Sequence, residues 1–276
     1  MDFSYKFDIG IVEYRNIIKV IKDTYGYDFS DYALTSLKRR FEKVILEHNL
    51  KQSDNLIEKI LKDAVFFDKF LQEVAIEGTE MFRDPSLWRY LRDEILPMII
   101  NEENLAKIWF PFCISGDELY TLAIVLKESD LLDKIEIIAS CINNQVIEQV
   151  QKGVFRPYKI DVSIDNYSHF QGNSHLNDYY KIAGDQVIRD TSLIKNANFI
   201  KQNINFDNSP KEVKLVIFRN QLIYYNQNLH DRVLKIIHQS LMTGGYLAIG
   251  FKEQIGMINS NNFKIVNVAE NVYKKV

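Results

Sequence analysis

The sequence predicts an all-α N-terminal domain followed by a mostly parallel α/β domain. Two observations predict this fold class. Apolar residues recur at helical spacing over residues 1–100, whereas from Lys107 short apolar runs alternate with amphipathic stretches. Such alternation indicates βαβ units, whose strands form a parallel sheet with helices on both faces. The 276 residues are enough for one large domain or two small ones.

The first part of the chain has the patterns of short amphipathic helices. We expect helices over residues 13–24, 32–48, 56–61 and 65–74. Ser30 and Asp31 are the expected cap of the second of these helices. Pro85 is placed to open a further helix over residues 86–95, because proline is well tolerated in a first helical turn. Pro97 follows the expected end of that helix.

The second part alternates between strands and helices. The expected strands cover residues 108–112, 135–141, 199–202, 213–218 and 246–251, and a terminal hairpin covers 263–276. The expected helices cover residues 118–127, 144–152 and 228–241. Gly244 and Gly245 are expected to form the turn after the last of these helices. Residues 154–198 carry no strong pattern, and a loop of that length is unusual in a compact domain, so we expect a small inserted β subdomain.

Composition excludes several classes of function. The net charge of -3 disfavours a general nucleic-acid binder. Cys113 and Cys141 are too few for a disulfide framework and have no zinc-site spacing, which favours a reducing, cytoplasmic compartment. We find no signal peptide and no apolar run long enough to span a membrane, so membrane insertion is not expected. The five histidines are scattered, and no metal site is expected.

Two segments that follow expected strands are candidate binding loops, because ligands of open α/β sheets bind at the carboxyl ends of the strands. Gly116 follows the first strand, where a small turn and a helix start bring backbone N–H groups close to a ligand. An ordinary tight turn explains a single glycine equally well. Arg219, Asn220 and Tyr224 follow the strand at 213–218 and offer oriented hydrogen bonds.

Four segments in this order resemble the CheR family, the S-adenosylmethionine-dependent methyltransferases that methylate glutamates of bacterial chemoreceptors. They are Thr-x-x-Phe-Arg at 79–83, Ser-Gly-Asp-Glu-Leu-Tyr-Thr at 115–121, Phe-Arg-Asn-Gln-Leu-Ile-Tyr-Tyr at 218–225, and Gly-Gly at 244–245 with Gly-x-x-Glu at 250–253. The resemblance implies a class I methyltransferase-like, Rossmann-like domain over residues 77–276. It also implies an insertion at about 154–198 and a helical domain over residues 1–76.

The resemblance implies S-adenosylmethionine as cofactor and a receptor glutamate as methyl acceptor in chemotaxis signal transduction. It places Arg83 and Tyr224 nearest the transferred methyl group. Arg83 would hold the incoming carboxylate by a charge-assisted pair, and Tyr224 would orient it. Taken without the resemblance, a structural ion pair and a packed ring are the simpler interpretations. The implied cofactor contacts are Thr79, Arg83, Gly116, Glu118, Cys141, Asn203, Ile204, Arg219 and Asn220.

A basic stretch on the second expected helix is a candidate docking surface. It contains Lys38, Arg39, Arg40 and Lys43. The resemblance implies that this helical domain docks on acidic cytoplasmic helices of a chemoreceptor, where opposite charge would speed encounter. A solvated helix face is the alternative, since Glu42 and Glu47 dilute the charge.

Three departures from the family pattern fall in the cofactor motifs. Phe112 stands where the family has glycine or another small residue, and Glu77 stands where it often has asparagine. Cys141 replaces an aspartate that accepts hydrogen bonds from the ribose hydroxyls. A charged hydrogen bond is worth about 1.5–3 kcal/mol, so its loss would weaken binding about 10- to 100-fold. Two alternatives therefore stay open: a degenerate receptor-binding relative with weak or no cofactor binding, and a methyltransferase for small carboxylates.

Overall fold

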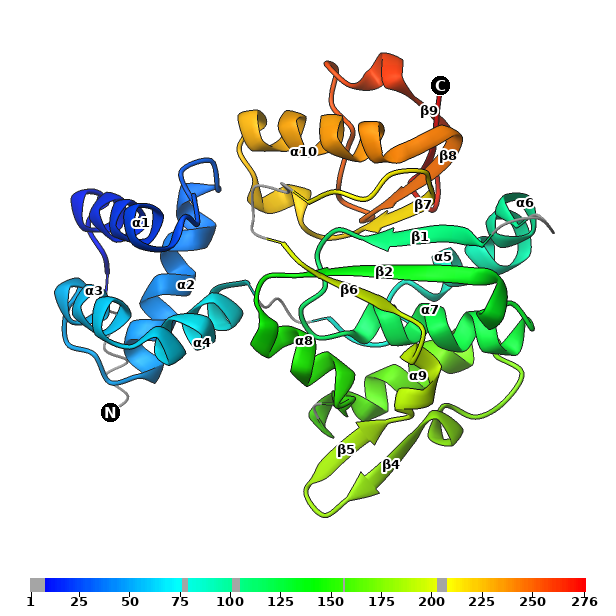
Figure 1. The fold of residues 1–276 in the computed structure, drawn as a ribbon, viewed down its shortest axis with the longest axis horizontal. Coiled ribbons are helices and arrows are strands. Elements are labelled where there is room, and N and C mark those ends of the chain that lie inside the picture. The colour runs from blue at the N-terminus through cyan, green and yellow to red at the C-terminus, as the bar shows by residue number, and fades with distance from the viewer. Residues whose placement is uncertain (1–7, 76–78, 101–104, 156, 203–207) are drawn as a thin grey trace.

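The computed structural model describes residues 8–75, 79–100, 105–155, 157–202 and 208–276. A helical N-terminal domain lies beside an α/β domain, as expected (Figure 1). The helical domain contains α1 (Ile11–Tyr25), α2 (Leu34–Glu47), α3 (Ser53–Lys62) and α4 (Ala64–Ala75). Their apolar stripes meet in one core, in which Ile17, Phe41 and Phe70 are fully buried.

The expected cap of α2 is wrong. The helix begins after Ala33, which has an extended backbone and provides no side-chain cap. Asp31 instead accepts a hydrogen bond from the Asn226 side chain at 3.0 Å, and the carboxylate of Asp28 accepts one from the Ser30 N–H. The Asp31 side chain therefore contacts the α/β domain and does not cap the helix.

The helix after Pro85 is longer than expected and does not end before Pro97. It consists of α5 (Pro85–Tyr90), a π-helical turn η1 (Leu91–Ile95) and α6 (Leu96–Ile99). Pro97 lies just after the junction of η1 and α6 and has no N–H to donate to the preceding turn of this helical segment. The π-helical turn thus lets one continuous helical segment accommodate the proline.

The main sheet has seven strands in the order β6-β2-β1-β7-β8-β10-β9. The strands β1 (Ala106–Phe110), β2 (Ile135–Cys141), β6 (Asn198–Lys201), β7 (Val213–Phe218) and β8 (Leu241–Ile249) run parallel, and β10 (Val272–Lys275) lies antiparallel between β8 and β9 (Phe263–Asn267). Gly244 and Gly245 lie inside β8, not in a turn before it. Val213 pairs with Leu241 but Leu215 pairs with Tyr246, so the two glycines lie in a bulge of β8.

Helices cover both faces of this sheet. They are α7 (Asp117–Glu128), α8 (Asn144–Gln151) and α10 (Gln227–Ser240). Alternate residues of β1 enter different apolar clusters, because Ile108 packs with residues of α7 and Trp109 packs with residues of α10. Short 3₁₀ turns complete the chain: η2 (Leu132–Lys134), η3 (Pro157–Lys159), η4 (Leu176–Tyr179), η5 (Thr191–Ile194), η6 (Leu222–Tyr224) and η7 (Ser260–Asn262).

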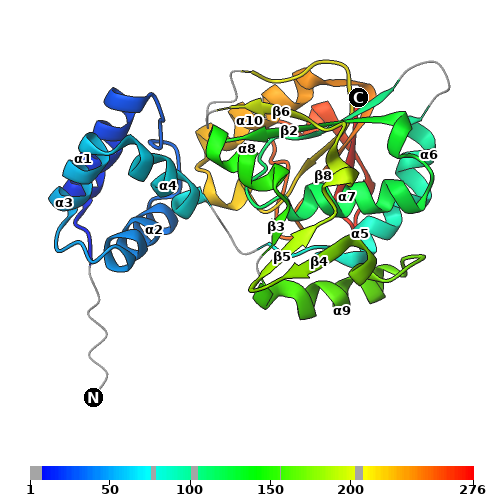
Figure 2. The same ribbon diagram turned by 60° about the horizontal axis from the view of Figure 1, so that its bottom comes forward.

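The inserted subdomain contains a helix as well as a sheet. Its antiparallel sheet has the order β3-β5-β4, formed by β3 (Val154–Phe155), β5 (Gln186–Arg189) and β4 (Tyr180–Ala183). The unexpected helix α9 (Ile160–Phe170) lies next to it along one side of the α/β domain (Figure 2). Its Phe170 ring packs 4.9 Å from the Phe82 ring, which anchors the insertion to the segment that carries the Thr-x-x-Phe-Arg motif.

Candidate active site

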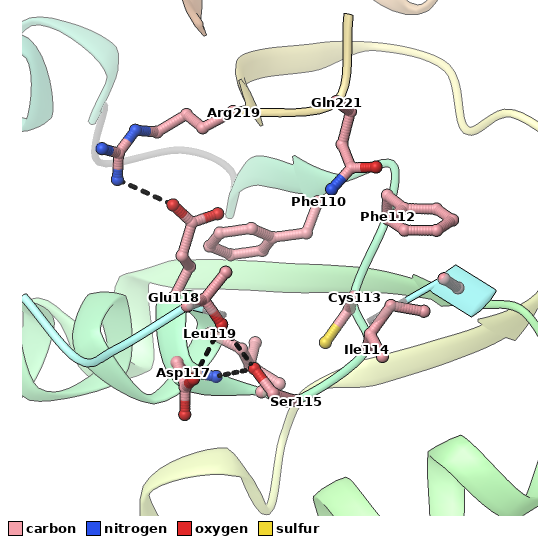
Figure 3. Close-up of a pocket in the computed structure, with 13 residues that line it drawn as sticks. Phe110, Phe112, Cys113, Ile114, Ser115, Asp117, Glu118, Leu119, Arg219 and Gln221 are labelled. Carbon is pink, nitrogen blue, oxygen red and sulfur yellow. Dashed lines mark hydrogen bonds and ion pairs between the residues drawn. The ribbon is translucent and has the colours of Figure 1, made fainter. Parts of the chain in front are cut away.

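A small cavity lies at the carboxyl ends of β1 and β7, where the α/β fold predicts a ligand (Figure 3). Its volume is about 40 Å³, which is room for only a few water molecules. The lining comes from the end of α4 and the segment after it, from the end of β1, from the β1–α7 loop with the first turn of α7, and from the residues just after β7. The lining residues are Ala75, Thr79, Phe110, Phe112, Cys113, Ile114, Ser115, Gly116, Asp117, Glu118, Leu119, Arg219 and Gln221.

The loop between β1 and α7 forms one wall of the cavity. Gly116 caps α7 in the left-handed region, with φ of 76°, and a Cβ at this position would lie 3.0 Å from the Val150 side chain. Both backbone conformation and space therefore require glycine at this turn. The Thr79 hydroxyl holds the loop in place, at 2.8 Å from the Ser115 hydroxyl and 2.7 Å from the Asp117 carboxylate.

Glu118 and Arg219 form an ion pair across the cavity. The Arg219 Nη1 donates to Glu118 Oε1 at 2.7 Å, and Figure 3 shows the two side chains turned toward each other. Arg219 is buried and also pairs with Asp84, so it is held in place from two sides. Burial raises the pKa of Glu118, and the Arg219 charge acts in the opposite direction. The pair presents a carboxylate to any ligand in the cavity.

Asn220 does not line the cavity, and its backbone N–H is held by Glu253. It adopts a positive φ of 58°, and its N–H donates to Glu253 Oε2 at 2.9 Å. A Cβ on Gly250 would lie 2.7 Å from Asn220 Oδ1, so the glycine permits this close packing. The matched Gly-x-x-Glu segment therefore acts here as a support for the end of β7. The predicted cofactor contact of Asn220 stays a prediction.

Arg83 and Tyr224 lie beside the cavity and do not line it. The Arg83 carbonyl accepts hydrogen bonds from Trp88 Nε1 at 3.0 Å and from Arg219 Nη1 at 3.3 Å. The Arg40 guanidinium lies 4.2 Å from the centroid of the Tyr224 ring. The roles expected for Arg83 and Tyr224 near the methyl group stay predictions.

The helical domain is fastened to the carboxyl ends of the strands. The Ala33 N–H donates to the Tyr224 carbonyl at 2.7 Å, and the Asn226 N–H donates to the Asp31 carbonyl at 2.8 Å. The Tyr27 hydroxyl donates to the Ile142 carbonyl at 2.9 Å, just after β2. These bonds place the helical domain over the edge of the sheet that contains the cavity.

The four basic residues of α2 have different surroundings. Arg39 and Lys43 are exposed, and Lys43 lies 3.5 Å from Glu47. Lys38 pairs with Asp8, and Arg40 donates to the Val74 carbonyl at 2.8 Å besides contacting Tyr224. Two of the four side chains therefore point to solvent, and Arg40 belongs to the domain junction. Asn203, Ile204 and Glu77 lie outside the described residues.

The two departures at the cavity differ in their effect. Phe112 is partly buried and lines the cavity together with Gln221, whose side chain is drawn next to it in Figure 3. Cys141, only 1% exposed, does not line the cavity. The neighbouring Cys113 thiol and burial raise the pKa of Cys141, which keeps it a neutral packing residue.

Sequence reasoning missed the buried ion cluster that supports the β1–α7 loop. Asp117, only 2% exposed, pairs with Arg189 of β5 and lies 3.6 Å from Lys159 Nζ. Arg189 also donates to the Ser115 carbonyl at 3.2 Å. No local motif marks Arg189, because the pairing exists only once the inserted subdomain folds back on the loop. The acidic residue directly after Gly116 was the available signal.

A seven-stranded parallel sheet with a reversed β10, and a cavity at a glycine turn that opens a helix, define a class I S-adenosylmethionine-dependent methyltransferase fold. Comparison with known families narrows this class. "CheR methyltransferase, SAM binding domain" matches residues 77–272, and "CheR methyltransferase, all-alpha domain" matches residues 12–75. The chain belongs to the CheR methyltransferase family, whose cofactor is S-adenosylmethionine, and the resemblance is confirmed.

Several relatives cover nearly the whole chain. The Pseudomonas putida protein named "Putative methyltransferase Cher3" is 32% identical over 265 residues, which cover 96% of this chain and 97% of that protein. The "Chemotaxis protein methyltransferase" of Listeria monocytogenes is 25% identical over 258 residues, covering 91% and 95%. The Borreliella burgdorferi protein of the same name is 23% identical over 264 residues, covering 92% of each chain. The crystal structure of TrmN from Thermus thermophilus covers 68% of this chain and 49% of its own, with 12% identity and a TM-score of 0.38, a likeness too distant to add to the assignment.

The residues at one end of the cavity have the chemical groups that S-adenosylmethionine requires, but the cavity is too small to hold the whole cofactor. Glu118, Thr79 and the turn at Gly116 offer a carboxylate, a hydroxyl and backbone N–H groups, which suit the amino acid end of the cofactor. Cys141 offers the ribose no carboxylate. The cavity of about 40 Å³ is far below the roughly 300–1,000 Å³ of small-molecule sites. Phe112 and Gln221 are among the side chains that line this small space.

Proposed function

We propose that the protein transfers a methyl group from S-adenosylmethionine to glutamate side chains on the cytoplasmic helices of a chemoreceptor. The position of Thr79, Glu118 and Arg219 carries this proposal, because residues of three separate family motifs line one cavity. The names of the Listeria and Borreliella relatives support the chemotaxis role. No helix in the described part of the chain is both long enough and apolar enough to cross a membrane. We place the reaction in the cytoplasm, where such receptor helices lie.

The chain's own residues would bind and orient the reactants. The cofactor supplies an electrophilic methyl group on a sulfonium. A glutamate carboxylate is already ionised at neutral pH, since its reference pKa is about 4.3, so the site needs no general base. Glu118, fixed by Arg219, would hold the ammonium group of the cofactor by a charge-assisted pair. The acceptor oxygen must then be aligned with the methyl group and shielded from water.

Arg83 and Tyr224 would perform this alignment. Arg83 is partly exposed, with its Nε 3.8 Å from a Glu80 oxygen, a separation long enough for an incoming carboxylate to replace Glu80 as its partner. The Arg40 guanidinium lies over the Tyr224 ring and would help to hold the ring in place. Arg39 and Lys43, both exposed on α2, would attract the acidic surface of the receptor helices.

Transfer of a labelled methyl group to receptor cytoplasmic fragments tests this proposal. The label should be released by mild base, as expected for a glutamyl ester. Arg83→Ala and Tyr224→Phe should each keep the fold, judged by thermal unfolding, and lower the rate of transfer. Unchanged rates in both variants would contradict the roles assigned to these side chains.

A receptor-binding module with little or no cofactor binding is the second candidate function. The small volume of the cavity favours it, as does a thiol at Cys141, where the family has a carboxylate. Calorimetric titration with S-adenosylmethionine and S-adenosylhomocysteine separates the two candidates. Micromolar binding supports the enzyme. Absence of binding, combined with intact capture of receptor fragments, supports the module.

A further inference from the structure

A second, larger cavity lies on the far side of the β1–α7 loop. Its volume is about 350 Å³, within the range of small-molecule sites. The β1–α7 loop, the end of α8 and the inserted subdomain enclose it. It shares Ile114, Ser115 and Asp117 with the cofactor cavity, so the two cavities lie back to back across one loop.

The described lining of this cavity is strongly cationic. Lys152, Lys159 and Arg189 line it together with a single carboxylate, Asp117. Lys152 lies at the exposed rim, with Glu148 3.7 Å away, whereas Lys159 and Arg189 are buried. Both buried cations contact the same carboxylate, so these three side chains together have a net charge of +1. A buried charge without a counter-charge is costly, which favours an anion in the cavity.

The Arg189 guanidinium has an unused donor. Its Nη2 pairs with Asp117 and its Nη1 donates to the Ser115 carbonyl, while its Nε, although buried, has no hydrogen-bond partner among the described residues. The guanidinium carbon lies 4.5 Å from the Phe155 ring centroid and 4.8 Å from that of Tyr120, so aromatic rings flank the group. This Nε has almost no accessible surface, so a ligand in the cavity would meet the positive charge of the guanidinium and not this N–H.

We propose that this second cavity binds a small organic anion with an apolar body. The negatively charged group, a carboxylate or a phosphate, would accept hydrogen bonds from Arg189 and Lys159. The apolar body would pack on the hydrophobic part of the lining, which consists of Ile114, Val150, Val154 and Phe155. Such a ligand is distinct from the cofactor, and its binding does not require the proposed methyl transfer.

Calorimetric titration of the whole protein tests this site with four probes: phenyl phosphate, benzoate, inorganic phosphate and neutral benzyl alcohol. At least one aromatic anion should bind about tenfold more tightly than benzyl alcohol and than inorganic phosphate. Tighter binding of phenyl phosphate would identify a phosphomonoester site, and tighter binding of benzoate a carboxylate site. Failure of both aromatic anions to bind, or equal affinity for benzyl alcohol, would overturn the proposal.

Two surface variants locate the binding without disturbing the buried cluster. Gln149→Trp, on the exposed part of the lining, should block the cavity and abolish binding of the aromatic anion. Lys152→Glu should weaken that binding about fivefold, because an attractive rim charge becomes repulsive. Lys264→Glu on β9 makes the same charge change at an exposed position that does not line the cavity, and should leave binding unchanged. Equal binding by all three variants would place the anion elsewhere and overturn the assignment.

Discussion

Replacing Phe112 by alanine is expected to tighten binding of S-adenosylhomocysteine about tenfold. The ring is partly buried and lines a cavity that is too small for the cofactor, so we expect the ring to move when the cofactor binds. Full burial of a phenylalanine is worth about 1.5–3 kcal/mol, so moving a half-buried ring loses roughly 1–1.5 kcal/mol. The alanine variant avoids that loss, and 1.4 kcal/mol corresponds to a factor of ten in the dissociation constant. Isothermal titration calorimetry measures this dissociation constant directly.

Two further variants serve as a control and a comparison for Phe112→Ala. Phe251→Ala makes the same chemical change at a side chain that is 74% exposed and does not line the cavity, so its affinity should equal that of the wild type. Cys141→Asp should gain less than Phe112→Ala, because this position is buried away from the cavity and a carboxylate there has no counter-charge. An unchanged affinity of Phe112→Ala, or a larger gain from Cys141→Asp, would refute the argument that space limits binding.

The other predictions concern stability, pH and docking. Asp117→Asn should lower the free energy of unfolding by about 3–5 kcal/mol in urea titration, because it leaves the buried Arg189 and Lys159 without their shared carboxylate; a loss below about 1 kcal/mol would contradict this. Burial raises the pKa of Glu253 above its unfolded value, so its contribution to stability is fully present at low pH and is lost as the pH rises through the folded-state pKa. The stability of Glu253→Gln relative to wild type should therefore increase with pH over that range, and a difference independent of pH would contradict the sign. Reversing the charge of Arg39 and Lys43 should slow association with receptor fragments at low salt and have little effect at high salt, whereas rates independent of salt would indicate a plain solvated surface.

The strands and most helices of this protein could be predicted because their signals are local. The expected strand at 213–218 coincides with β7, and that at 135–141 with β2. Each is a short buried apolar run bounded by polar residues, a pattern that does not depend on the rest of the chain. The helix α9 was missed because its buried face is narrow. Only Ser163, Tyr167 and Phe170 are buried, and the other positions are mostly polar.

Part of the cavity could also be predicted, because each of its motifs follows a strand. The β1–α7 turn and Arg219 come directly after strands whose carboxyl ends meet at one edge of the sheet. The positions of Asn220 and Tyr224 relative to the cavity could not be predicted. The backbone N–H of Asn220 donates to Glu253, and the Tyr224 ring lies against the Arg40 guanidinium at the domain junction. Both outcomes depend on contacts with residues far away in the chain.

The sequence by itself determined the fold class, the order of the strands along the chain and the family, because these depend on apolar periodicity and on short motifs. Only the tertiary structure decided that Phe112 lines a cavity of about 40 Å³, that Cys141 does not, and that Arg189 of the insertion supports the β1–α7 loop. The physical reason is the range of the interactions. Periodicity and turn chemistry act over a few residues, whereas cavity volume and buried ion pairs arise from residues that are far apart in sequence and packed together only in the folded chain.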